Sequence, residues 1–251
     1  DEVFSSECAN FLFLQETRLS DNFRNARRAS FSVFGSPSDN GAHGCEIWIN
    51  KKLPFVFHGK KHIFVPDWVK RLHFGPRYLF LVISFPFGKL GLASIHGPCK
   101  NHPKSYIAKF WDDMIVCASY FAKENIPLVV GTDTNARLGG LTSGSVGSWQ
   151  PNPEDFCGQC FHKFLDRCDL TTPSTFEYCH SGGPFTYYTR RNHLKATGHR
   201  IDYPCIPKTM IASAKTHVNS SLGVELAFND HHPVQCKCSI VLDNGFDLRP
   251  A

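Results

Sequence analysis

Short apolar runs separated by polar turns recur along the first hundred residues, and each run has the length of a β-strand. The runs span residues 11–14, 31–34, 45–49, 62–65, 77–85 and 90–95. Apolar runs of this length bounded by Gly, Pro, Asn and Ser indicate buried strands. Pro86, Phe87 and Gly88 separate the last two runs, which favours a hairpin there.

The pattern then changes to a helical one. Apolar residues recur at spacings of three and four from Tyr106 to Phe121, which predicts one buried helix face. Pro127 lacks the amide hydrogen that a helix needs, so we expect this helix to end near Asn125. A buried strand over 126–130 should follow.

A second helix is expected after the polar loop 137–150. Asn152 is a suitable N-cap, and Pro153 suits the first helical position. Further strands are expected over 185–189, 201–206 and 236–241. No internal repeat or linker divides the chain, so we expect residues 1–251 to form a single α/β domain. The excess of strands over helices favours two packed sheets flanked by helices.

Composition narrows this picture only slightly. Hydrophobic residues make up 42% and charged residues 20%, which is ordinary for a globular protein. No apolar run approaches the roughly 18–20 residues that a membrane-spanning helix needs. The net charge of +5 is compatible with a polyanionic partner, but it is weak support for one.

The cysteines favour a reduced protein. There are eleven, and several lie in apolar runs, where a thiol packs as a small hydrophobic group. We therefore expect an intracellular, reducing location. Cys157, Cys160 and His162 are spaced like half of a zinc site, but no second half follows at a matching spacing, so a structural zinc is not expected.

Polar residues that could carry chemistry fall at the predicted strand ends. Strand ends are where sites form in α/β folds. Several carboxylates at one rim hold a hard cation, and added histidines suggest phosphoryl transfer, which needs charge neutralisation and proton transfer. The candidates are Glu16, His96, Asp133, Asn135, Asp202, Asp230 and His231.

Four motifs at these positions resemble one known family. They are Leu14-Gln15-Glu16-Thr17, Gly131-Thr132-Asp133-Thr134-Asn135-Ala136, Arg200-Ile201-Asp202-Tyr203 and Asn229-Asp230-His231-His232-Pro233. In this order they resemble the endonuclease/exonuclease/phosphatase superfamily, which includes deoxyribonuclease-like and exonuclease-III-like enzymes. The resemblance covers nearly the whole chain. It implies a four-layer α/β sandwich, in which two packed mixed β-sheets are flanked by helices.

The resemblance also implies a metal site. Glu16 would ligate the metal, and Asp230 would be a second ligand or would orient water. The implied cofactor is Mg²⁺, with Mn²⁺ as a substitute. His96, in a block that reads Ser-Ile-His-Gly-Pro, would donate a hydrogen bond to the phosphate.

The remaining roles concern the reaction itself. Asp133 would orient or deprotonate the attacking water, and Asn135 would bond a phosphate oxygen. Their spacing of two would place both on one face of a strand. Asp202 would accept a hydrogen bond from His231, which would contact the scissile phosphate as a proton-transfer partner or electrostatic stabiliser.

A basic segment follows the predicted strand 185–189. Arg190, Arg191 and Arg200 are candidates for a clamp on nucleic-acid phosphates, although a charged exposed loop would look the same. Tyr187 or Tyr188 could stack on a base, while the other packs inward.

Among relatives, the motifs look most like the endonuclease domain of non-LTR retrotransposons. The expected activity is therefore DNA nicking, with a reverse transcriptase downstream in the full-length chain and a nuclear location. Two alternatives stay open: a phosphatase or lipid phosphodiesterase of the same fold, and an inactive nucleic-acid-binding remnant. The family normally opens with a strand that carries an Asn before the Gln-Glu motif, so we expect this chain to be truncated, with its first strand missing.

Overall fold

The computed structural model describes residues 9–19, 24–188, 197–220, 230–242 and 246–250. The chain divides into two compact units. Unit 1 comprises Asp1–His96, Val116–Thr132 and Cys238–Ala251, and unit 2 comprises Gly97–Ile115 and Asp133–Lys237. The organisation of residues 1–251 as a single domain stays a prediction.

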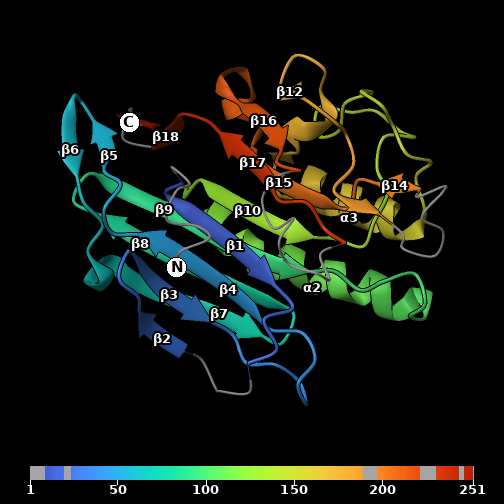
Figure 1. Ribbon diagram of the computed structural model, residues 1–251, viewed down its shortest axis with the longest axis horizontal. Helices are drawn as coiled ribbons and strands as arrows, with labels where there is room; N and C mark the ends of the chain where they lie inside the picture. The colour runs from blue at the N-terminus through green and yellow to red at the C-terminus, as the bar shows by residue number, and fades with distance from the viewer. Residues whose placement is uncertain (1–8, 20–23, 189–196, 221–229, 243–245, 251) are drawn as a thin grey trace. The chain divides into compact units, whose positions relative to one another are not determined.

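Unit 1 contains a four-stranded antiparallel sheet in the order β1, β4, β3, β2, drawn in blue in Figure 1. Its strands are β1 (Phe11–Gln15), β2 (Arg24–Arg27), β3 (Phe31–Gly35) and β4 (Cys45–Asn50). Strands β3 and β4 are buried along their whole length, which fits their nearly continuous apolar sequences. Gln15 pairs with Cys45, so the last residue of β1 lies beside the first of β4.

A second sheet in unit 1 runs in the order β10, β9, β8, β7. Its strands are β7 (Val69–Gly75), β8 (Tyr78–Phe85), β9 (Gly88–His96) and β10 (Leu128–Asp133), whose last residue is assigned to unit 2. Phe85 pairs with Gly88, so the predicted hairpin is confirmed. The two sheets pack closely, since a Cβ on Gly131 would lie 2.3 Å from the Cβ of Phe13.

Helix α2 (Lys104–Lys123) confirms the predicted helix and ends close to Asn125. Its last turns belong to unit 1, where the Phe121 ring lies 6.0 Å from that of Phe80. Gly91 makes this contact possible, because a Cβ there would approach Phe121 to 2.4 Å. Unit 1 thus layers a helix on one of two packed sheets.

The remaining strands of unit 1 form a sheet in the order β18, β19, β5, β6. Their bounds are β5 (Phe55–Phe57), β6 (Lys60–His62), β18 (Ile240–Leu242) and β19 (Phe246–Pro250). The strand predicted over 62–65 is wrong, because β6 ends at His62 and Pro66 soon begins the 3₁₀ turn η1 (Pro66–Trp68). The strand predicted over 236–241 is two strands, β17 (Val234–Lys237) and β18.

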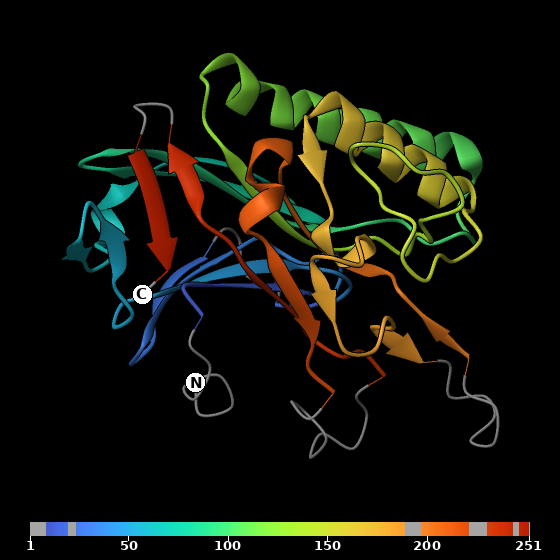
Figure 2. The same cartoon turned by 90° about the horizontal axis from the view of Figure 1, so that it is seen from above.

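In unit 2, helix α3 (Phe156–Arg167) lies beside the first half of α2, as Figure 2 shows. The Trp111 ring lies 4.9 Å from Phe161 and 5.3 Å from Phe164. The predicted N-cap Asn152 is wrong by three residues, since Asp155 caps the helix by accepting from the amide of Gly158 at 2.8 Å. Asn152 instead accepts from the amide of Arg200 at 3.2 Å.

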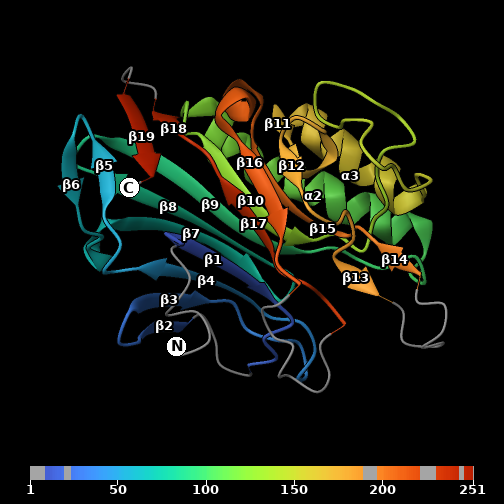
Figure 3. The ribbon, with the colours of Figure 1, turned by 45° about the horizontal axis from the view of Figure 1, so that its top comes forward.

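The strands of unit 2 are short. They form the sheet β12-β16-β17, visible in Figure 3, and the pairs β13-β14 and β11-β15. Their bounds are β11 (Leu170–Thr171), β12 (His180–Ser181), β13 (Tyr187–Tyr188), β14 (Gly198–His199), β15 (Asp202–Pro207) and β16 (Lys215–Val218), with the 3₁₀ turns η2 (Pro173–Thr175) and η3 (Lys208–Ser213).

The predicted α/β class with packed sheets and few helices is confirmed. All ten cysteines in the described ranges are free thiols. Across those ranges, no helix combines the length and the apolar character required to span a membrane.

Candidate functional site

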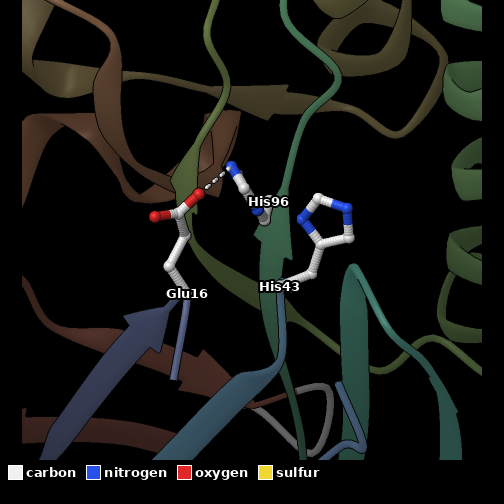
Figure 4. A group of neighbouring side chains, drawn as sticks. All are labelled: Glu16, His43 and His96. Atoms are coloured by element: carbon white, nitrogen blue, oxygen red, sulfur yellow. Dashed lines mark ion pairs between the residues drawn. The ribbon is translucent and has the colours of Figure 1, made fainter. Parts of the chain in front are cut away.

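Unit 1 gathers Glu16, His43 and His96 into one cluster, which we call the Glu-His-His cluster (Figure 4). Glu16 follows the end of β1, and His96 is the last residue of β9. One potential ligand atom from each of the three residues lies within 4.8 Å of the others. The sequence pattern gives no signal for His43, which lies in the polar turn before β4.

The carboxylate of Glu16 lies between the side chains of His96 and Arg18. Its Oε1 is 3.7 Å from Nε2 of His96, and its Oε2 accepts from Nη2 of Arg18 at 3.1 Å. Burial alone would raise the pKa of Glu16, but the hydrogen bond from Arg18 and the charges of His96, Arg18 and His43 lower it. The Glu16 carboxylate is therefore ionised near neutral pH.

The backbone holds this cluster in an unusual conformation. Glu16 and His43 have φ angles of 55° and 66°, in the left-handed region that non-glycine residues seldom adopt. The amide of Arg18 donates to the carbonyl of His43 at 2.7 Å, and that of Thr17 donates to Gly44 at 3.2 Å. Such strain persists only where surrounding contacts enforce it, and it concentrates at functional sites.

Gln15 anchors the strand that presents Glu16. Its Nε2 donates to Oγ of Ser94 at 2.9 Å and to the carbonyl of Gly131 at 3.2 Å. The Ser94 hydroxyl in turn donates to the carbonyl of Leu14 at 3.0 Å. Gln15 thus links β1 to β9 and β10 and fixes the position from which Glu16 extends.

Unit 2 gathers Asp133, Asp202 and His231 into a second cluster, which we call the Asp-Asp-His cluster. Nδ1 of His231 donates to the Asp202 carboxylate at 3.0 and 3.2 Å. Burial alone would lower the pKa of His231. The hydrogen bond and charge of Asp202, with the charges of Asp133 and Asp230, raise this pKa to about 9. His231 is therefore an imidazolium at neutral pH.

Asp133 ends β10, and the chain leaves the sheet directly after it. The amide of Gly97 donates to the Asp133 carbonyl at 2.7 Å, and the amide of Thr134 donates to Ile201 at 2.9 Å. Asn135 has a φ of 49°, and its amide donates to Oδ1 of Asp133 at 3.0 Å. The expectation that Asp133 and Asn135 share one face of a strand is wrong, because β10 ends at Asp133 and Asn135 lies in the irregular segment after it.

Asp230 lies next to this cluster in sequence, and its charge contributes to the pKa of His231. Its carbonyl accepts from the amide of Tyr188 at 3.0 Å. The Tyr187 ring lies 4.8 Å from the His231 ring, and that of Tyr188 lies 5.3 Å from His232. Asp230 does not belong to either candidate metal-binding group found among the described residues.

Of the three arginines predicted to clamp substrate phosphates, only Arg200 lies in the described part of the chain. Arg190 and Arg191 lie outside the described residues. Arg200 is only 3% exposed, and its guanidinium donates to the carbonyls of Pro184 at 2.9 Å and Trp149 at 3.3 Å. This burial argues against the expected contact of Arg200 with substrate phosphates, because its donors already bond main-chain oxygens.

The donor atoms indicate which metals fit. The Glu-His-His cluster offers one carboxylate oxygen and two imidazole nitrogens, a set that suits a divalent cation but matches Mg²⁺ poorly, since Mg²⁺ prefers oxygen ligands. The thiol of Cys157 donates to the carbonyl of Pro98 at 3.7 Å, and burial and nearby acidic groups raise its pKa to about 12. The absence of a structural zinc at Cys157 and Cys160 stays an expectation.

No protein-family model and no curated protein sequence matches the chain. Solved structures do match. A 3′ phosphatase from Neisseria, NExo, bound to a product DNA hairpin, is similar with a TM-score of 0.67 and 18% identity over 94% of this chain and 91% of that one.

Two further structures are similar to this chain. The catalytic domain of Xenopus laevis APE2 has a TM-score of 0.64 and 15% identity over 100% of this chain and 88% of that one. The endonuclease domain of TRAS1, a telomere-specific non-LTR retrotransposon, has a TM-score of 0.52 and 15% identity over 88% and 80%. These likenesses confirm the predicted α/β fold with packed sheets.

Proposed function

We propose that this chain is a divalent-metal-dependent phosphodiesterase that nicks DNA. The observation that carries the proposal is the Asp-Asp-His cluster. There, Asp202 holds a protonated His231 at 3.0 Å, and Asp133 offers a carboxylate close by. Phosphodiester hydrolysis needs stabilisation of the charge that develops on the phosphate and a group that acts on the attacking water. The positively charged His231 and the neighbouring Asp133 carboxylate could supply these two functions.

His231 acts in this proposal as a donor, not as a base. Its Nδ1–H is directed to Asp202, which orients the ring and stabilises its charge. Nε2 then donates to a non-bridging or leaving oxygen of the phosphate as negative charge develops there. A preorganised charged donor of this kind contributes several kcal/mol, about 100-fold or more in rate.

Asp133 and Asn135 act on the water and the phosphate. The Asp133 carboxylate orients or deprotonates the attacking water. The backbone amide of Asn135 holds this carboxylate in place by donating to Oδ1 of Asp133 at 3.0 Å. The side-chain amide of Asn135 donates to the carbonyl of Gly97 at 3.1 Å. On the strength of the motif resemblance, this side-chain amide is also proposed to bond a phosphate oxygen.

A divalent cation held by Glu16 would neutralise phosphate charge and favour ionisation of a bound water. Asp230 is proposed as a second ligand on the strength of the motif resemblance. DNA as substrate is supported by NExo, which was solved with a DNA hairpin, and by the endonuclease domain of TRAS1. A retrotransposon origin, with a reverse transcriptase in the full-length chain, rests on the same likeness to TRAS1.

The proposal is tested by nicking of supercoiled plasmid in the presence of a divalent metal. Wild type should convert plasmid to open circles, and EDTA or Asp133→Ala should abolish the conversion, because each removes a group that acts on the water or the phosphate. Asp113→Ala is a matched control, since Asp113 is an exposed carboxylate on α2 that pairs only with Lys109 at 3.0 Å among the contacts described. Equal rates for Asp133→Ala and wild type would overturn the assignment.

A second candidate reaction is removal of a 3′ phosphate from DNA, which the likeness to NExo favours. It needs the same water, cation and phosphate contacts. Phosphate release from a 3′-phosphorylated hairpin, without nicking of plasmid, would select this reaction. Release from both substrates would indicate one site with a broad choice of phosphate esters.

A further inference from the structure

We infer that Glu16, His43 and His96 bind a late first-row divalent metal such as Zn²⁺ in preference to Mg²⁺. The inference rests on the proposed function in one respect, because it specifies which cation serves that activity. It differs from the expectation of Mg²⁺ drawn from the motifs, and the residue responsible is His43.

The donor set is the first argument. Mg²⁺ takes oxygen ligands in octahedral geometry and keeps several waters, whereas imidazole nitrogen suits Zn²⁺ and its neighbours in the first row. Two histidines and one glutamate are a set that holds catalytic zinc with a position open for water. The Glu-His-His cluster offers this set within 4.8 Å.

The separations are the second argument. Nε2 of His96 and Oε1 of Glu16 are 3.7 Å apart, longer than the usual limit of about 3.2 Å for a hydrogen bond. Two ligands at about 2.1 Å from one Zn²⁺ lie up to roughly 4.2 Å apart, so this pair already has the spacing of two ligands on one ion. The Glu16 side chain is 48% exposed, so a small adjustment of it would let Glu16, His96 and the third ligand, His43, contact one ion.

The rigidity of the histidines is the third argument. His96 is only 4% exposed, its amide donates to the Arg77 carbonyl at 2.8 Å, and its ring meets the His43 ring edge-on at 5.4 Å. His43 is held to the segment after β1 by the 2.7 Å bond from Arg18. Figure 4 shows the His96 ring beside the Glu16 carboxylate and the His43 ring on the other side of His96 in this view.

Arg18 is compatible with a bound ion. It contacts Oε2 of Glu16, so the carboxylate presents Oε1 toward His96 as a single ligand atom. The Arg18 side chain is 66% exposed, and solvent therefore screens its repulsion of a cation.

The test is metal binding by the full chain after removal of metal with a chelator. Co²⁺, a spectroscopic stand-in for Zn²⁺, should give visible absorption bands on binding, and Zn²⁺ should displace it at far lower concentration than Mg²⁺. His43→Ala should weaken Co²⁺ and Zn²⁺ binding by at least about tenfold, since even groups that only orient a ligand contribute 10–100-fold. His58→Ala, which removes an exposed histidine of the same unit, should bind as wild type does.

Displacement of Co²⁺ by Mg²⁺ as readily as by Zn²⁺ in wild type would overturn the inference, and this result does not depend on any variant folding. Unchanged Co²⁺ and Zn²⁺ binding in His43→Ala and His43→Gln would overturn it too. Selective Zn²⁺ binding by a chain that cleaves no phosphate ester would contradict the proposed function and leave the metal assignment standing.

Discussion

At the scale of single residues, the charge on His231 decides what this side chain can do. Its pKa of about 9 means that it carries a proton throughout the neutral range. A protonated imidazole cannot accept a proton from water, so in the proposed reaction His231 is a donor and a positive charge, and the carboxylate of Asp133 is proposed to act on the water. Asp202 is proposed as a positioning residue that acts through its hydrogen bond with His231.

The same charge predicts a pH dependence of stability. A pKa raised above its ordinary value of 6.5 means that the folded state binds the proton more tightly than the unfolded state. The stabilisation is complete below about pH 6.5, declines as pH rises, and is lost above about pH 9. Thermal melts of wild type and Asp202→Asn in EDTA should therefore differ most near pH 6 and converge near pH 10. A gap in Tm that stays constant over this range would contradict the assigned protonation state.

Most residues of the two clusters could be predicted from the sequence, because they lie in recognisable motifs at the ends of predicted strands. Glu16, Asp133, Asp202 and His231 all lie in the described clusters. His43 could not be found this way, since its place beside Glu16 depends on the left-handed turn and the contact with Arg18. Arg200 reads as a surface cation, but the fold buries it against Trp149, a pairing across 51 residues.

At the scale of elements, the segment after β9 fixes the position of Asp133. A Cβ on Gly97 would lie 2.4 Å from the carbonyl oxygen of Thr134, which is rigid main chain. Only glycine lets the two segments approach, and this approach supports the bonds from Gly97 to Asp133 and from Asn135 to Gly97.

Gly97→Ala should therefore lower the free energy of unfolding by about 1–3 kcal/mol, as overpacking does. It should also reduce phosphodiesterase activity, because Asp133 and Asn135 would move. Urea unfolding measures the first effect. Gly183→Ala is the matched control, since a Cβ there meets nothing within 4 Å. Equal stability of the two variants would show that the contact with Thr134 relaxes without cost.

Elements with strong local patterns were predictable, and elements that depend on distant partners were not. Helix α2 and the β8-β9 hairpin carry their signals within one stretch of chain. Strands β12 and β16 are short and pair in parallel across 36 residues, as between His180 and Thr216. Strand β7 contains charged residues and a bulge between Val69 and Arg71, which disrupts the alternation of a strand. The start of α3 was ambiguous because Asn152 and Asp155 are both capable caps.

At the scale of the whole molecule, the fold is similar to that of solved structures although the sequence has diverged from theirs. No family model matches the chain, and its identity to these three solved structures is only 15–18%. Their TM-scores are nevertheless 0.52 to 0.67, and the alignments cover most of each chain. Fold alone does not determine substrate, so the proposal of phosphodiester hydrolysis rests on the chemistry of the two clusters, and the proposal of DNA as substrate rests on the likenesses to NExo and TRAS1. Each unit carries one of the two groups of side chains that could hold a metal ion among the described residues.

The most direct test of the account is the nicking rate constant of His231→Ala at saturating divalent metal. If His231 stabilises charge on the reacting phosphate, the rate should fall at least about 100-fold, while His58→Ala should keep the wild-type rate. A His231→Ala enzyme that nicks plasmid as fast as wild type would remove His231 from the reaction and contradict the central claim.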